Sequence, residues 1–135
     1  EVTVALNIPP SDVSYPDIVE RQLYRITQQA IENAVEHAHP TQVTVEGSLN
    51  EGAIHLIIRD NGVGMPNPQQ LDLVGLLENH HYGLVGMYER ASLINAEMHI
   101  TSEPGTYTVI EVKWAAPEVR SMPDKVSEDM KAHTV

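Results

Sequence analysis

The chain has no cysteine and no phenylalanine, and it has few basic residues. Its 135 residues include eight Lys and Arg against 19 Asp and Glu, which gives a formal charge of −11. The lack of cysteine excludes disulfides and thiolate metal sites. An acidic surface repels the phosphates of nucleic acids, so we expect no nucleic-acid partner. No apolar run approaches the roughly 20 residues that cross a bilayer as a helix.

The composition predicts one globular domain over residues 1–117, followed by a polar tail over residues 118–135 that we expect to be disordered. The chain starts at Glu1 without a methionine or a signal-peptide pattern. We therefore expect a fragment of a longer protein. The fragment is expected to be cytoplasmic, with a parent that is either soluble or anchored in a membrane.

Hydrophobic periodicity predicts the order of the elements. Strands are expected at residues 2–8, 42–49, 53–59, 97–102 and 106–114, and helices at residues 15–38 and 83–95. A short helix is expected near residues 69–77, within the long connection 60–82. This order predicts an α/β fold: a two-layer sandwich in which a mixed sheet of about five strands carries helices on one face.

The long helix has a polar edge. Gln29, Asn33 and His37 are spaced at i, i+4 and i+8 and share one face, with Glu36 beside them. A plain solvated face would look the same. Asparagine, however, is a poor residue for a helix interior, and its carboxamide oxygen can ligate a hard cation.

The second candidate is Asp60-Asn61-Gly62-Val63-Gly64-Met65, at the end of a strand. Its two glycines allow the backbone to approach a ligand, and the aspartate can accept a hydrogen bond from an exocyclic amine. An ordinary turn is the alternative, because Asp-Asn-Gly is common turn chemistry. The ligand spacing of an EF-hand calcium loop is absent.

The third candidate is the glycine-rich helix start at residues 80–87, His-His-Tyr-Gly-Leu-Val-Gly-Met. Free N–H groups at a helix start attract phosphate, although a plain packing helix would also fit. The segment is neither a Walker A loop nor a dinucleotide fingerprint. Because Arg59 is the only Lys or Arg between positions 40 and 89, a triphosphate would need Mg²⁺ and backbone donors. For His80-His81, solvent-exposed histidines are favoured over a transition-metal site.

Together these segments resemble the GHKL superfamily, whose ATP-binding domain has the Bergerat fold. Residues 25–38 resemble its N box, residues 60–65 its G1 box, residues 81–91 its G2 box and residues 104–106 its last motif. The resemblance covers roughly residues 1–115. It is closest to bacterial sensor histidine kinases, in the branch that includes nitrate/nitrite sensors.

The resemblance implies ATP and Mg²⁺ as cofactors and phosphoryl transfer to histidine as the reaction. Asn33 would ligate Mg²⁺ and act in catalysis with Gln29, Asp60 would bind the adenine amine, and residues 66–82 would form the ATP lid. The implied ATP-binding residues are Asn33, Glu36, His37, Asp60, Gly62, Gly64, Met65, Tyr82, Gly83, Leu84, Val85, Gly86 and Thr106.

Two residues depart from the family pattern: Gln29 replaces a Glu, and Glu36 replaces a Lys. A neutral amide is no general base, and a carboxylate repels phosphate unless Mg²⁺ lies between. A catalytically degenerate nucleotide-binding or interaction module therefore stays an alternative, as does another GHKL ATPase or an anti-sigma serine kinase.

The phosphoacceptor histidine is expected outside this fragment, because no histidine here precedes an acidic residue. The expected partners are thus ATP, an upstream dimerisation domain of the same protein and a response regulator. We expect the isolated domain to be a monomer and its parent a homodimer.

Overall fold

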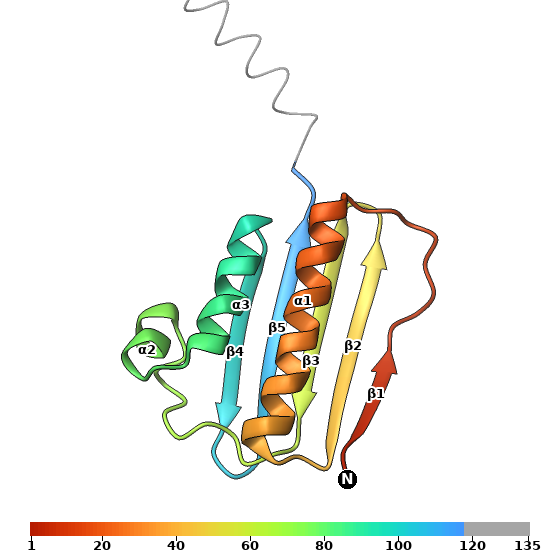
Figure 1. Ribbon diagram of the computed structural model, residues 1–135. Coiled ribbons are helices and arrows are strands. Elements are labelled where there is room, and N and C mark those ends of the chain that lie inside the picture. Colours follow the sequence, from red (N-terminus) through yellow and green to blue (C-terminus); the bar gives the residue numbers. More distant parts are fainter. Residues whose placement is uncertain (118–135) are drawn as a thin grey trace, which may run out of the picture.

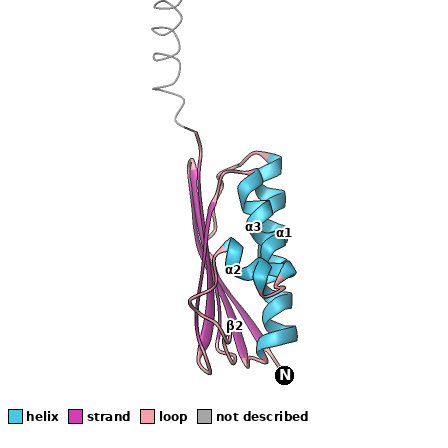
Figure 2. Cartoon of the chain, turned by 90° about the vertical axis from the view of Figure 1, so that its left-hand side faces the viewer, coloured by secondary structure: helices cyan, strands magenta, loops and turns pink. Residues whose placement is uncertain are grey.

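Five strands form one sheet, and two long helices cover a single face of it (Figures 1 and 2). This computed structural model describes residues 1–117; the predicted tail lies outside the described residues. The strands follow the order β1-β2-β3-β5-β4 across the sheet. They are β1 (Thr3–Asn7), β2 (Gln42–Asn50), β3 (Ala53–Asp60), β4 (Glu97–Glu103) and β5 (Tyr107–Ala115). Only the β1–β2 pair of this sheet is parallel, so the predicted mixed, five-stranded α/β sandwich is confirmed.

Helix α1 (Asp17–Asn33) lies along the sheet and ends in a π-helical turn. The predicted helix reaches Ala38 as expected, but its last residues, Ala34–Ala38, form the wider turn named η1. His39 then adopts a left-handed conformation with φ 49°, which ends the helix before Pro40. π-helical turns occur often at functional sites, and this one directly follows Asn33.

The core lies between α1, α3 (Tyr82–Leu93) and the sheet. Strands β2 and β3 alternate, so Val43, Val45 and Ile58 face the helices and are buried. Ile26 of α1 and Met87 of α3 pack opposite them with no exposed surface. Burying an aliphatic side chain of this size stabilises the fold by about 1.5–3 kcal/mol. The sequence period therefore fixes which face of each element turns inward.

The connection between β3 and α3 contains the short helix α2 (Leu73–Glu78). The prediction placed its start at residue 69, which is wrong by four residues. Asp72 caps the helix, because its Oδ1 accepts a hydrogen bond from the Gly75 N–H at 2.8 Å. The Tyr88 hydroxyl of α3 donates to the Leu71 carbonyl at 3.1 Å and ties this segment to the body of the domain. None of the helices within residues 1–117 has the length and apolarity to cross a membrane.

Candidate functional site

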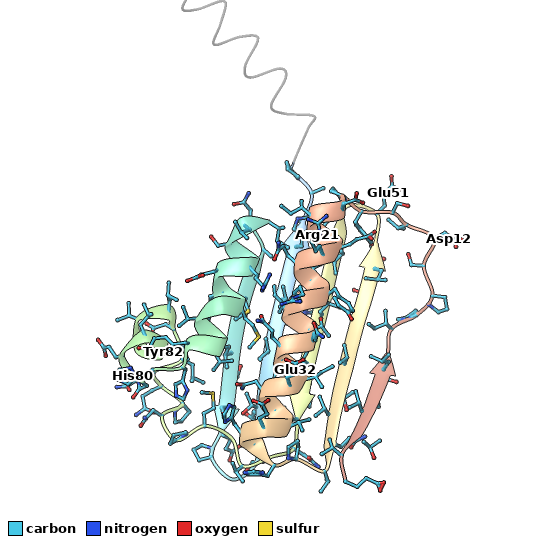
Figure 3. The ribbon with its side chains drawn as sticks, in the orientation of Figure 1. Asp12, Arg21, Glu32, Glu51, His80 and Tyr82 are labelled. Atoms are coloured by element: carbon cyan, nitrogen blue, oxygen red, sulfur yellow. The ribbon has the colours of Figure 1, made fainter. Side chains whose placement is uncertain are left out.

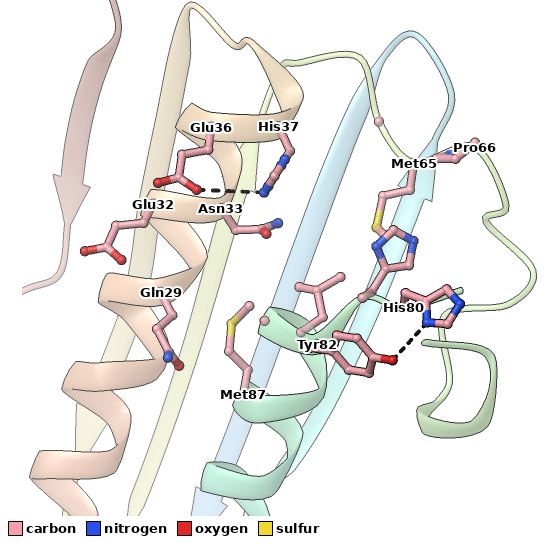
Figure 4. A pocket seen from close by; sticks show the side chains of 14 residues that line it. Gln29, Glu32, Asn33, Glu36, His37, Met65, Pro66, His80, Tyr82 and Met87 are labelled. Atoms are coloured by element: carbon pink, nitrogen blue, oxygen red, sulfur yellow. Dashed lines mark hydrogen bonds and ion pairs between the residues drawn. The ribbon is translucent and has the colours of Figure 1, made fainter. Parts of the chain in front are cut away.

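A cavity of about 430 Å³ lies between the end of α1, the start of α3 and the end of the Asp60–Met65 loop (Figure 4). It brings together the three segments that the sequence singled out. The predicted residues on its wall are Gln29, Asn33, Glu36, His37, Gly64, Met65, Tyr82, Gly83 and Leu84. Two other cavities of comparable size lie elsewhere, so volume alone does not identify the site.

Five predicted residues are not on the wall: Asp60, Gly62, Val85, Gly86 and Thr106. Five wall residues were not among the predicted site residues: Glu32, Pro66, His80, His81 and Met87. Glu32 could have been found from its position next to Asn33 and one turn before Glu36. The two histidines had a signal as well, because they directly precede the glycine-rich helix start.

Asn33 faces the start of α3. Its side chain projects from α1 toward that helix (Figure 4), and a Cβ atom built on Gly83 would lie 3.9 Å from its Oδ1. The first N–H groups of a helix have no partner within the helix and carry its positive dipole end. One hard oxygen ligand and one set of backbone donors therefore face each other across the cavity.

Gln29, one turn before Asn33, has a buried Oε1 that finds no hydrogen-bond partner within the described chain. Buried polar atoms are normally paired, so an unpaired one at a cavity wall suits a ligand or a bound water. Glu36 and His37 lie at the rim, where each side chain is 70% exposed. The Glu36 Oε2 and the His37 Nε2 are 3.8 Å apart.

The loop after β3 is fastened to the end of α1. The Val63 N–H donates to the Ala38 carbonyl at 2.8 Å. A Cβ atom on Gly62 would lie 2.6 Å from the Ala38 Cβ, so only glycine fits at that approach. The Asn61 Oδ1 accepts from the N–H groups of Thr41 and Gln42, both at 2.9 Å. The Asp-Asn-Gly sequence is thus held against the end of α1 and the start of β2 by hydrogen bonds and close packing, unlike a solvent-exposed turn.

Ser102 fastens the same loop to the β4–β5 hairpin. Its Oγ accepts from the Met65 N–H at 2.7 Å, lies 2.9 Å from the Tyr107 carbonyl and 3.1 Å from the Thr108 Oγ1. A carbonyl can only accept, so the single Ser102 hydroxyl hydrogen goes to Tyr107 and Thr108 donates to Ser102. Gly64 adopts a left-handed conformation with φ 71°, and a Cβ atom there would lie 3.0 Å from the Ser102 Oγ, so the loop and the hairpin approach closely at a glycine.

Asp60 lies buried at the end of β3, with 6% of its surface exposed. Its Oδ1 accepts from the Gly62 N–H at 2.9 Å. Burial raises the pKa of Asp60, and hydrogen bonds from the backbone of Gly62 and Thr108 offset part of that rise. Thr106 lies exposed in the hairpin turn, where its N–H donates to the Glu103 carbonyl at 3.0 Å. The adenine role inferred for Asp60 and the ATP-binding role inferred for Thr106 stay predictions.

His80 and Tyr82 lie at the opposite side of the cavity from α1 (Figure 4). His80 adopts a left-handed conformation with φ 60°, and its Nδ1 lies 2.8 Å from the Tyr82 hydroxyl oxygen. Their rings pack edge to face, with 5.7 Å between the ring centroids. His81 precedes α3 and makes no capping hydrogen bond through its side chain.

Comparison with known proteins identifies the family of the chain. A sequence model described as "Histidine kinase-, DNA gyrase B-, and HSP90-like ATPase" matches residues 18–118. The sensor protein VraS of Staphylococcus aureus strain COL is 41% identical over 102 residues, which cover 76% of this chain and 27% of VraS. VraS of Staphylococcus epidermidis matches to the same extent. The chain thus spans about a quarter of the length of these curated relatives.

Solved structures share the fold. The histidine kinase domain of a blue-light activated histidine kinase from Erythrobacter litoralis EL346 aligns with a TM-score of 0.64 at 20% identity. The alignment covers 84% of this chain and 51% of that one. The Acinetobacter baumannii histidine kinase AdeS aligns with a TM-score of 0.65 at 14% identity, over 87% and 55% of the two chains.

Proposed function

The chain belongs to the family of histidine kinase-, DNA gyrase B- and HSP90-like ATPases, and we propose that it is the ATP-binding catalytic domain of a sensor histidine kinase. The observation that carries this proposal is the opposition of Asn33 and Gly83 across the cavity. A hard-cation ligand that faces free helix N–H groups is the arrangement that a metal-bound polyphosphate needs. Within the GHKL superfamily we place it in the branch of the nitrate/nitrite sensors.

The residues present fit Mg²⁺-ATP. Asn33 offers a carboxamide oxygen, and the unpaired Gln29 Oε1 can accept from a metal-bound water. Bound Mg²⁺ would neutralise phosphate charge and polarise the terminal phosphoryl group. The start of α3 would hold the phosphates through the N–H groups of Gly83 and Leu84. Asp60 and Gly64 would serve the adenine, and residues 66–82 would close over the nucleotide as a lid.

The reaction we propose is phosphoryl transfer to a histidine on a dimerisation domain outside this fragment. The bond from the γ-phosphorus to the β–γ bridging oxygen breaks, a bond to an unprotonated imidazole nitrogen forms, and ADP leaves. A neutral imidazole is already nucleophilic, so Gln29 need not act as a base. The phosphoryl group would then pass to a response regulator. We place the domain in the cytoplasm, as part of a homodimeric parent.

A second function is favoured by one observation. The wall carries Gln29 and Glu36 where the resemblance leads us to expect Glu and Lys. An amide and a carboxylate at those points weaken water activation and phosphate binding. A module that binds nucleotide weakly, or that only binds other domains, would tolerate both.

Calorimetric titration with a non-hydrolysable ATP analogue, with and without Mg²⁺, tests the proposal. We expect Mg²⁺-dependent binding that Asn33→Ala abolishes and that Gln28→Ala leaves intact. Gln28 is an amide on the same helix but outside the cavity wall. Failure to bind at millimolar nucleotide would contradict the kinase assignment. Binding without phosphoryl transfer, once the dimerisation domain is present, would favour the second function.

A further inference from the structure

The cavity must hold a polyanion although its wall is acidic. Within residues 1–117 the wall contains two carboxylates, three imidazoles and no Lys or Arg. Arg59, the only Lys or Arg between positions 40 and 89, is exposed on β3 and is not part of the wall. Imidazoles are therefore the side chains of the described wall that can become cationic.

Two of the imidazoles stand together at the lid side. The ring of His81 makes no capping hydrogen bond to α3, and His81 is part of the cavity wall together with Gly83 and Leu84. The ring of His80 is oriented by the Tyr82 hydroxyl at 2.8 Å from Nδ1. When His80 is protonated, its Nδ1–H donates to that oxygen and its Nε2–H is left as a second donor.

The two carboxylates of the wall lie on the α1 side of the cavity. Glu32 and Glu36 belong to α1, and Figure 4 shows the Glu32 carboxylate pointing away from His80 and Tyr82. The third imidazole, His37, lies 3.8 Å from Glu36, so part of any charge it gains is already balanced. The other ionisable groups beside the pair are Glu78, at the end of α2, and the Tyr82 phenol. The lid histidines can thus face the phosphates without an intervening acid from α1.

We propose that His80 and His81 are proton-dependent phosphate contacts, so that nucleotide binding takes up protons and tightens as the pH falls through the range in which imidazole titrates. This inference rests on the proposed nucleotide function. A nearby anion favours the charged form of an imidazole, and by linkage the charged form favours the anion. A histidine whose proton affinity rises tenfold on binding strengthens the nucleotide affinity by up to about tenfold at acidic pH.

The test is calorimetry with ADP and excess Mg²⁺ between about pH 6 and 8, around the ordinary imidazole pKa. Each titration is repeated in two buffers of different ionisation enthalpy, which gives the number of protons taken up. The proteins are the unaltered chain, the double variant His80→Gln/His81→Gln and the control His99→Gln. His99 is an exposed histidine on β4, away from the cavity.

We expect the unaltered chain and His99→Gln to take up protons equally. The double variant should take up fewer, and its Kd should rise about tenfold near pH 6 but little near pH 8. Protons that ADP itself gains or loses contribute equally for all three proteins, so they cancel when the proteins are compared. Thermal melting verifies that each protein is folded. The two single variants separate the contribution of His80 from that of His81.

Equal pH profiles for the unaltered chain and the double variant would overturn the inference. A loss of affinity that is the same at every pH would also overturn it, because the histidines would then act as neutral contacts. Absence of ADP binding by the unaltered chain at every pH would instead contradict the proposed function.

Discussion

The carboxamide oxygen of Asn33 lies 3.9 Å from the point that a Cβ atom on Gly83 would occupy. A methyl group at residue 83 would therefore make only an ordinary van der Waals contact with the end of α1. Gly86, one turn further along α3, has no atom within 4 Å of its Cβ position. Neither glycine is required for packing in the absence of a ligand.

Substitution of these glycines separates folding from binding. Gly86→Ala should stabilise the free domain by about 1 kcal/mol, since alanine favours the helical state over glycine. Because the resemblance assigns Gly86 to nucleotide binding, this variant should nevertheless bind the ATP analogue more weakly. Gly83→Ala should bind it more weakly still, because Gly83 is part of the cavity wall and its new methyl group would enter the cavity. Chemical denaturation and calorimetry measure the two effects. A Gly86→Ala protein that is more stable and binds equally well would show that residue 86 is an ordinary helix position.

Charge reversal at the rim should improve binding. Glu36→Lys replaces repulsion of phosphate by attraction at a side chain that is 70% exposed. Screened contacts of this kind are modest, so we expect the Kd to fall about threefold to tenfold at low salt and the gain to shrink at high salt. Glu51→Lys makes the same charge change in the β2–β3 turn, away from Glu32, His80 and Tyr82 (Figure 3), and serves as the control.

An equal gain from both variants would assign the effect to net charge alone. Unchanged or weaker binding by Glu36→Lys would show that Glu36 does not face the phosphates.

Much of the fold could be predicted because it depends on local periodicity. Ile26 and Met87 each belong to a series of apolar residues at helical spacing, and both are fully buried. Val43 and Val45 alternate with polar residues along the predicted strand 42–49, and both are buried in the core. The start of α2 was missed because the apolar pattern begins before the residue that can cap the helix. Asp72 decides that boundary through one side-chain hydrogen bond.

The site was predictable as a set of segments but not as a set of contacts. The spacing of Gln29, Asn33 and His37 placed them on one face, and all three line the cavity. The contacts of Ser102 with Met65 and Thr108 join segments that only the folded sheet brings together. Local pattern carries no information about such long-range pairs.

The buried carboxyl of Asp60 should give stability a specific pH dependence. Burial raises the pKa of Asp60 above its ordinary value of 3.8, so the folded state holds that proton more tightly than the unfolded state. The free energy of unfolding, measured relative to Asp60→Asn, should therefore increase as the pH falls from the raised pKa to below 3.8. The other carboxyl groups are present in both proteins, so their contributions to the free energy of unfolding cancel in this difference. Denaturant titrations at a series of pH values provide the measurement, and a difference that is flat with pH would contradict the expectation.

Removal of the Ser102 hydroxyl should loosen the side of the cavity that Gly64 and Met65 form. In Ser102→Ala the Met65 N–H and the Tyr107 carbonyl each lose a partner. A buried polar group left unpaired costs about 1–3 kcal/mol, which denaturant unfolding will detect. Ser92→Ala, at an exposed position of α3, should change stability by less than about 0.5 kcal/mol. Because Gly64 and Met65 line the cavity, Ser102→Ala should also weaken nucleotide binding, whereas Ser92→Ala should not. Lost stability with unchanged affinity would mean that Ser102 holds the sheet together but does not position the loop for its ligand.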